Sequence, residues 1–207
     1  MTAGEQNGHE FRVLSSTERF AGRVVRLVSD EIALPGGTGV RDYVVHPGAV
    51  AVAALDDEGR IVLLKQYRHP VRADLWELPA GLLDVAGEPA LETAARELWE
   101  EADLRAERWH VLADLLTSPG GSDEAIRLYL ARALSEVPPA ERHTRTDEEA
   151  VMTIERLDLD TAVGMVFDGT IQNATCAAGV LGAARARQDG FAGLRPADSP
   201  WGARPGR

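Results

Sequence analysis

The sequence predicts an α/β protein, an α/β/α sandwich built on a mixed β-sheet, with a small antiparallel β-sheet at its N-terminal end. Three observations lead to this prediction. Residues 49–53 are apolar at every position, so this strand needs cover on both faces. A helical pattern over residues 88–102 lies between strand patterns, and further helical patterns follow later in the chain. Strands and helices mixed in this order favour helices on both faces of a sheet.

Composition supports a globular fold and excludes several kinds of partner. The 207 residues are 44% hydrophobic and carry a net charge of −11. Nucleic acid is excluded as a partner, because its binders normally present a basic face. The single cysteine, Cys176, rules out an internal disulfide, and we expect it to be a buried helix residue. Without a signal peptide or a membrane-spanning run, we expect a cytoplasmic protein with no membrane partner.

The N-terminal part is expected to form antiparallel strands. Residues 11–34 and 40–45 contain many β-branched and aromatic side chains, and a glycine-rich turn at 35–39 separates them. A sheet this small buries little by itself, so we expect it to pack on another domain or subunit. The expected divisions are a disordered N-terminus (1–9), the N-terminal sheet (10–47), the main domain (48–189) and a C-terminal tail (190–207).

The main domain is expected to begin with a second hairpin, formed by residues 49–55 and 60–67 around an acidic turn. Residues 135–149, rich in Pro, Glu, Arg and Thr, should form an exposed loop. The remaining expected strands are 75–78, 109–116, 125–134 and 151–157, and the expected helices are 88–102, 158–167 and 173–188.

The helix over residues 88–102 is expected to have an acidic edge. Glu97 and Glu101 lie together at the edge of the apolar face, and Glu100 lies next to Glu97 on the outer side. Like charges at this spacing destabilise a helix by a few tenths of a kcal/mol, and nearby apolar surface makes ionisation costlier. At about 100° per residue, the face expected to be buried consists of Leu91, Ala94, Ala95, Leu98 and Ala102.

A bound divalent cation would offset this repulsion. Mg²⁺ prefers oxygen ligands and is often held by a few carboxylates together with substrate phosphates. Arg96 and Glu92 lie on a separate stripe with Glu88, from which they would support the ligands and fix their rotamers. Taken alone, however, a run of charges is more often a solvated helix face.

The context of this helix resembles the Nudix box. Six residues separate Gly81 from Glu88, and seven more separate Glu88 from Arg96. Residues 96–104 read RELWEEADL. The family pattern is Gly, five residues, Glu, seven residues and then Arg-Glu-U-x-Glu-Glu-x-Gly-U, where U is aliphatic. This chain departs from it by one extra loop residue and by Asp103 in place of glycine, at a position where a left-handed backbone is common. The resemblance covers roughly residues 49–188 and implies a Nudix fold.

The resemblance also implies a metal site and a catalytic base. The cation would be Mg²⁺, with Mn²⁺ as the alternative, and it would lower the pKa of the attacking water. The base would come from an acidic loop after the helix, with Glu148 as the first choice and Glu149 as the second. The implied metal ligands are the Ala80 carbonyl, Glu97 and Glu101, with Glu100 contributing through a shared ion or water.

Segments outside the box resemble the ADP-ribose pyrophosphatases within the family. Pro119, fifteen residues after Leu104, matches a marker of that subfamily, and Ser122 belongs to a similar Ser-Pro-Gly-x-Ser-x-Glu arrangement. A plain turn between strands would explain the same residues. Arg68 is a candidate for holding a phosphate bidentately, and a surface ion pair is the alternative. Glu77 is a candidate for contacting the substrate or an arginine.

This resemblance implies hydrolysis of ADP-ribose, a nucleoside diphosphate derivative, to AMP and ribose 5-phosphate by a homodimer formed through the N-terminal sheet. Two alternatives stay open. One is a Nudix hydrolase of another such derivative, for example a nucleotide sugar or NADH. The other is a non-catalytic regulator that binds ADP-ribose; such proteins often lose box glutamates, which this chain keeps.

Overall fold

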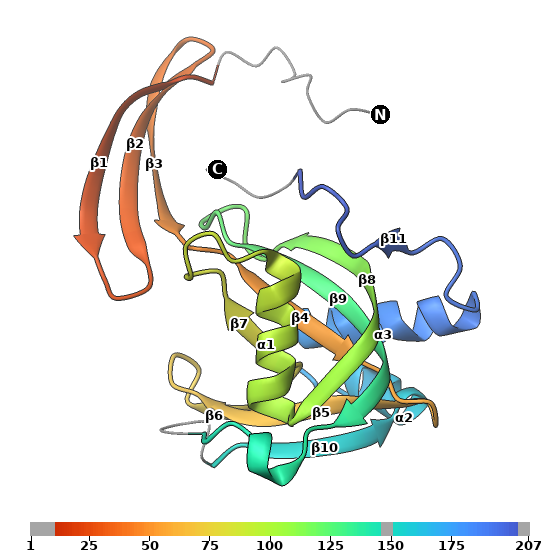
Figure 1. Ribbon diagram of the computed structural model, residues 1–207. Helices are drawn as coiled ribbons and strands as arrows, with labels where there is room; N and C mark the ends of the chain where they lie inside the picture. The colour runs from red at the N-terminus through yellow and green to blue at the C-terminus, as the bar shows by residue number, and fades with distance from the viewer. Residues whose placement is uncertain (1–10, 146–150, 203–207) are drawn as a thin grey trace.

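The computed structural model describes residues 11–145 and 151–202 of the chain (Figure 1). The expected disordered segment, residues 1–9, lies outside them. An antiparallel sheet at the N-terminal end, in the order β1-β2-β3, projects away from the rest of the molecule. Its strands are β1 (Val13–Ala21), β2 (Arg26–Leu34) and β3 (Gly37–Val45). The predicted N-terminal antiparallel sheet is therefore confirmed.

The turn between β2 and β3 is tighter than the sequence suggested. Leu34 pairs with Gly37, so Pro35 and Gly36 alone form the turn. Gly36 has a φ of 97°, a left-handed backbone that favours glycine. The glycines expected in the turn after this point are instead part of β3.

The main sheet has five strands in the order β11-β8-β9-β4-β7. β4 and β9 run parallel and the other neighbours run antiparallel, so the predicted mixed sheet is confirmed. Its strands are β4 (Ala49–Ala54), β7 (Ala80–Leu82), β8 (Leu104–Leu116), β9 (Ala125–Glu136) and β11 (Arg195–Pro196). A second sheet, β10-β5-β6, contains β5 (Arg60–Arg68), β6 (Ala73–Glu77) and β10 (Thr153–Asp158).

The predicted second hairpin is wrong. β4 pairs with β9 and β7, whereas β5 pairs with β6 and β10, and an isolated bridge between Leu55 and Ile61 joins the two strands. An entirely apolar strand has no polar face to leave in water, so β4 lies inside the larger sheet. The turn that follows it lets β5 enter a different sheet.

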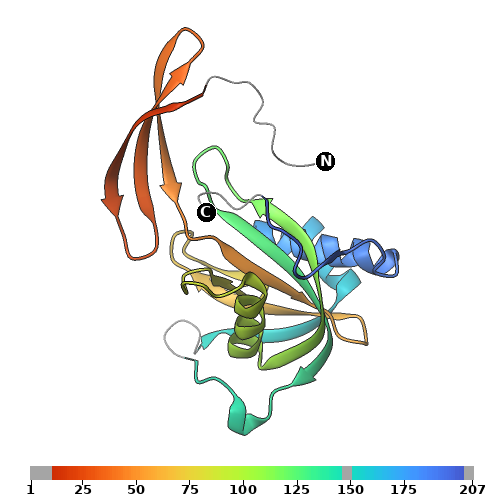
Figure 2. The same ribbon diagram turned by 45° about the horizontal axis from the view of Figure 1, so that its top comes forward.

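Helices cover both faces of the main sheet, as predicted (Figures 1 and 2). Val50 and Val52 of β4 pack in one apolar cluster with residues of α1 (Ala90–Ala102), while Ala51 and Ala53 pack in another with residues of α3 (Ala174–Gln188) and α2 (Leu159–Phe167). A short 3₁₀ helix, Pro139–Glu141, lies in the loop after β9. Within the described residues, no helix combines the length and apolar character needed to cross a bilayer.

Helix α1 begins after Pro89 and ends at Asp103. Asp103 has a φ of 54°, so the residue that replaces the usual glycine adopts the expected left-handed conformation. Arg145 donates to its carboxylate at 2.7 Å, which helps to hold this helix end. One expected core residue is wrong, because Ala95 is exposed, whereas Thr93 is buried.

The segment after α3 packs on the main sheet as far as Trp201. β11 pairs with β8, and Arg127 donates to the carbonyl oxygens of Ser199 and Pro200 at 2.7 and 3.1 Å. The guanidinium of Arg127 also lies over the ring of Trp201, 4.9 Å from its centroid. These contacts correct the expectation of a simple tail, because a buried arginine needs partners that the segment supplies.

Candidate active site

Helix α1 lies beside β7 (Figure 1), and two of its carboxylates contact the backbone of that strand. The Ala80 N–H donates to Glu101 Oε2 at 2.8 Å. The Glu97 side chain occupies the space beside Gly81, where a Cβ would lie only 2.0 Å from Glu97 Oε1. Glycine is needed at this position because any side chain would displace the carboxylate. The structure therefore brings two of the expected metal ligands, Glu97 and Glu101, next to Ala80, whose N–H rather than its carbonyl makes the contact.

Arg96 connects the carboxylates at the outer side of α1. Its Nη1 donates to Glu97 Oε1 at 2.7 Å and to Glu100 Oε2 at 2.9 Å. Its Nε and Nη2 donate to the two oxygens of Glu88, each at 3.1 Å. The hydrogen bond from Arg96 lowers the pKa of Glu88, and the same bond raises the pKa of Arg96. Glu92, the other expected supporting residue, is exposed and has no hydrogen bond or ion pair within the described residues.

A cavity of about 490 Å³, called the main cavity below, adjoins these carboxylates. Ala80 and Gly81 form part of its wall and also contact Glu101 and Glu97, so the acidic groups lie next to it. Its apolar lining includes Ala49, Val50 and Ala51 at the start of β4. The polar residues that line it are His46, Arg68, Glu77, Thr117, Glu124, Asn173 and Thr175.

The structure pairs Arg68 with Glu77 at the wall of the main cavity. Arg68 Nε and Nη2 donate to the two Glu77 oxygens at 2.8 and 2.5 Å. The Glu77 side chain is 6% exposed and that of Arg68 is 43% exposed. A bidentate pair of this kind fixes the plane of the guanidinium. Glu77 thus makes the arginine contact, and Arg68 forms an ion pair, the alternative that the sequence left open, while its phosphate contact stays a prediction.

Cys176 lies on α3, close enough to Glu77 for the charge of Glu77 to affect the pKa of the Cys176 thiol. Burial raises the pKa of the Cys176 thiol to about 12, and the negative charge of Glu77 adds to the effect. A thiol with this pKa stays protonated near neutral pH and is a poor nucleophile. Cys176 is therefore a buried helix residue, as the sequence indicated.

The loop between β8 and β9 contains two predicted substrate residues, neither of which lines the main cavity. Pro119 is exposed in a turn closed by a hydrogen bond from the Gly121 N–H to the Ser118 carbonyl. Ser122 forms a bridge with Val44 at the end of β3. The loop therefore joins the N-terminal sheet to the main domain in this chain, as a plain structural turn would.

Residues on either side of this loop do reach the main cavity, although the sequence did not single them out as site residues. Thr117 Oγ1 donates to Glu124 Oε2 at 2.5 Å, and Glu124 Oε1 lies 3.6 Å from His46 Nδ1. Glu124 belongs to the motif that contains Pro119, so a signal for it was present. His46 precedes β4 and had no such signal, because its neighbour Glu124 is far along the chain.

The N-terminus of α3 forms another part of the cavity wall that was missed. Residues 173–175 line the cavity, and Asn173 Oδ1 caps the helix by accepting the Cys176 N–H at 2.9 Å. Unpaired N–H groups and the helix dipole make such an end favourable for anions. An asparagine before an apolar helical pattern is the sequence signal for this cap.

The proposed catalytic bases, Glu148 and Glu149, lie outside the described residues. Within residues 11–145 and 151–202, no group of three or more His, Cys, Asp or Glu is arranged to hold a metal ion. The groups that do meet are the carboxylates of Glu97 and Glu101 and the main chain of β7. Carboxylate oxygens suit a hard divalent cation that retains part of its water shell.

An α/β/α sandwich with an acidic helix facing a glycine-containing strand beside a polar cavity agrees with the Nudix-type hydrolase that the sequence predicted. The NUDIX domain family matches residues 45–169, and the chain belongs to this family. The family and fold predicted from the sequence are confirmed.

Three known proteins are similar to this chain. The chain is 49% identical to the ADP-ribose pyrophosphatase of Mycobacterium tuberculosis (strain ATCC 25618 / H37Rv) over 198 residues, which cover 95% of this chain and 94% of that protein. It is 39% identical to the methanol dehydrogenase activator of Bacillus methanolicus over 163 residues, which cover 78% and 86% of the two chains. A crystal structure of an ADP compounds hydrolase has the same fold, with a TM-score of 0.72 and 20% identity over 88% of this chain and 96% of that one.

Proposed function

We propose that the chain hydrolyses the diphosphate bond of ADP-ribose and releases AMP and ribose 5-phosphate. The observation that carries this proposal is the contact of Glu97 and Glu101 with Ala80 and Gly81 at the wall of the main cavity. The similarity to an ADP-ribose pyrophosphatase over nearly the whole chain supports the choice of substrate.

The metal site would consist of the Ala80 carbonyl, Glu97 and Glu101, with Glu100 contributing through a shared ion or water. Nudix hydrolases generally depend on a divalent cation, for which Mg²⁺ is our first choice and Mn²⁺ the second. When bound, the cation supplies charge neutralisation and a lower pKa for nearby water. Arg96 keeps Glu97 and Glu100 in place because it donates to both of them.

The substrate diphosphate would lie in the main cavity. Arg68, oriented by Glu77, offers its guanidinium to a phosphate, and the N-terminus of α3 adds partial positive charge. Such local positive groups are needed because the net charge of the whole chain is −11. Pro119 and Ser122 do not line this cavity, so they would contact a part of the substrate that extends beyond it, from the loop that touches the end of β3.

The attacking water would lose its proton to Glu148, with Glu149 as the second candidate. This assignment rests on the resemblance to related enzymes, since both residues lie outside the described part of the chain. A carboxylate on a loop next to the diphosphate can orient the water as well as accept its proton.

The N-terminal sheet would form a homodimer with a second copy. β1 is exposed along its whole length, which is unusual for a strand that carries several apolar side chains. Sedimentation of the purified chain tests this assembly. The exposed apolar residues of the sheet and its flanks are Phe11, Val13, Leu14, Phe20, Val24, Leu27 and Val40.

The decisive experiment measures products from a panel of ADP-ribose, a nucleotide sugar and NADH with Mg²⁺. AMP and ribose 5-phosphate from ADP-ribose, at the highest kcat/KM of the panel, are the expected result. Binding of ADP-ribose without turnover would favour the regulator instead. Glu97→Gln should abolish turnover, whereas Glu107→Gln, an exposed control on β8, should leave it unchanged. Near-normal hydrolysis by Glu97→Gln would show that the metal site is wrongly assigned.

A further inference from the structure

A second pocket, called the distal pocket below, lies at the other end of the main sheet. Its volume is about 230 Å³. β4 starts at the main cavity with Ala49, and the chain reaches the distal pocket at Leu55. At about 3.3 Å per residue, this path places the two sites roughly 20 Å apart. The distal pocket is lined by Leu55, Asp56, Asp57, Gly59, Arg108, Arg132, Arg187 and Phe191.

Two arginines of this pocket face each other without an anionic partner. Arg108 on β8 and Arg132 on β9 are paired in register. Neither forms an ion pair with a carboxylate of the described residues, whereas Arg127 on the same strand as Arg132 pairs with Asp114 at 2.7 Å. Like charges directly opposite each other destabilise a sheet. Burial and the charge of Arg108 both lower the pKa of Arg132.

The Arg132 guanidinium is held in place by an aromatic ring. Its central carbon lies 3.8 Å from the centroid of the Phe191 ring. Phe191 follows the end of α3 and has a φ of 63°, a conformation that bulky residues rarely adopt. The Phe191 N–H donates to the Ala186 carbonyl at 2.7 Å, which fixes this turn. Arg132 Nε is nevertheless buried without a hydrogen-bond partner, so the site has an unused donor.

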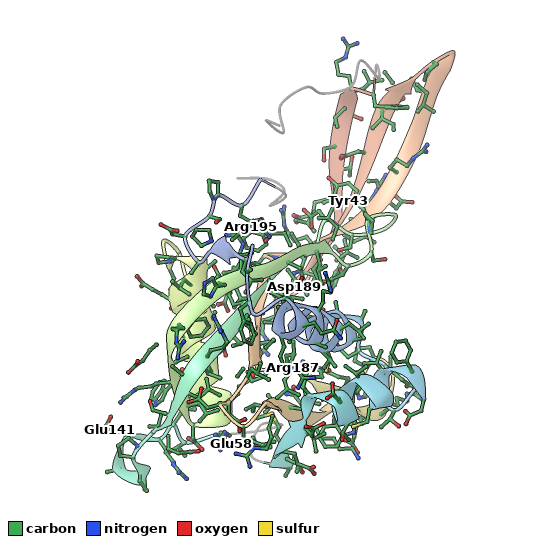
Figure 3. The ribbon with its side chains drawn as sticks, turned by 90° about the vertical axis from the view of Figure 1, so that its right-hand side faces the viewer. Tyr43, Glu58, Glu141, Arg187, Asp189 and Arg195 are labelled. Carbon is green, nitrogen blue, oxygen red and sulfur yellow. The ribbon has the colours of Figure 1, made fainter. Side chains whose placement is uncertain are left out.

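The charged residues that line the distal pocket are three arginines and two aspartates. Asp56 is neutralised because its oxygens accept the main-chain N–H and the Nε of Arg60, each at 2.8 Å. Asp57 is exposed to solvent. Arg187 on α3 pairs with Asp160. Figure 3 labels Arg187 of α3 and Glu58 of the turn between β4 and β5, which both lie at this end of the molecule.

We propose that Arg108 and Arg132, with Arg187 at the edge, form a second anion site that takes a small phosphate-bearing ligand. Guanidinium groups match phosphate oxygens bidentately, and a dianion would offset the repulsion between the two facing arginines. The volume lies below the roughly 300–1,000 Å³ of pockets for drug-sized ligands. Inorganic phosphate and a sugar phosphate monoester share the required chemistry.

Calorimetric titration of the full chain tests the proposal, with inorganic phosphate and ribose 5-phosphate as separate probes and a chelator present. We expect binding with a Kd of roughly 10 mM or below. Arg108→Gln and Arg132→Gln should each weaken it by about tenfold or more. Arg105→Gln is the matched control, because Arg105 is exposed on the same strand as Arg108 and pairs with Glu141.

Arg132→Gln removes the contact with Phe191. If that loss unfolds the variant, Arg108→Gln still tests the proposal, because Arg108 is exposed. Amide chemical shifts locate the ligand. Changes near residues 108, 132 and 191 support the distal pocket, and tighter binding of one probe identifies the preferred source of phosphate. Unchanged affinity in Arg108→Gln, shifts confined to the main cavity around Arg68, or no binding of either probe would overturn the proposal.

Discussion

Replacing Gly81 with alanine is expected to disable the active site without unfolding the protein. The added Cβ would lie 2.0 Å from Oε1, 2.1 Å from Cδ and 2.5 Å from Cγ of Glu97. Real Cβ atoms essentially never approach other atoms within 3.0 Å, so the carboxylate must move away by about 1 Å. The movement also disturbs the contact between Glu97 and Arg96.

The size of the effect follows from this displacement. A misplacement of about 1 Å at a reacting group can lower a rate by about 100-fold, which corresponds to roughly 2.7 kcal/mol of transition-state stabilisation. Overpacking a folded site costs about 1–3 kcal/mol. We expect Gly81→Ala to destabilise the fold by about 1 kcal/mol, the lower end of this range, because a side-chain carboxylate can rotate away. In a protein of this size, that loss lowers the Tm by roughly 2–4 °C.

The assay compares kcat/KM for ADP-ribose over a series of Mg²⁺ concentrations and records thermal unfolding in parallel. Gly164→Ala is the matched control, because a Cβ built on this glycine of α2 meets nothing within 4 Å apart from its chain neighbours and the backbone of its own helix. The control should keep full activity, while Gly81→Ala should lose about 100-fold. Activity of Gly81→Ala within about threefold of the wild type would refute the idea that Gly81 positions Glu97.

Three further predictions concern other groups. Arg96→Lys should lower the apparent Mg²⁺ affinity by about 10- to 100-fold, because lysine cannot replace the contacts to several glutamates; an unchanged metal titration would contradict this role. The folded-state pKa of Glu88 is below its ordinary value of 4.5, so its pairing with Arg96 stabilises the protein above that pH and is lost as the pH falls through the lowered pKa. Urea unfolding of Glu88→Gln should accordingly depend less on pH in this acidic range, and an unaltered pH profile would count against the ion pair. Cys176, with its pKa of about 12, should resist iodoacetamide at neutral pH until the chain is unfolded. Rapid labelling of the native protein, followed by mass spectrometry, would disprove its burial.

Local patterns predicted the acidic helix well. The spacing of apolar residues placed Leu98 in the core, and the same period placed Glu97 and Glu101 at the edge that meets β7. Asp103 was expected to be left-handed from its place in the box, and it is. Such features depend on neighbours within one or two helical turns, so the sequence contains nearly all the information. Ala95 was the exception, because the width of the buried face depends on what packs against it.

Strand pairing could not be read in the same way. β4 was expected to pair with the next strand in the chain, but its parallel partner is β9. An apolar strand forms the same main-chain hydrogen bonds with many partners, and packing of the whole core selects among them. The pairing of Arg108 with Arg132 also depends on a register between strands that the sequence did not predict.

The site on the acidic helix thus depends both on local sequence and on tertiary structure. The sequence by itself determined that Glu97 and Glu101 share one edge of a helix and that the chain resembles Nudix hydrolases, because helical period and motif spacing are local properties. Only the tertiary structure decided that these carboxylates meet Ala80 and Gly81, and that His46 and the N-terminus of α3 complete the wall of the main cavity. Contacts between distant segments arise when the two apolar clusters on either side of β4 pack, and no short pattern encodes their geometry.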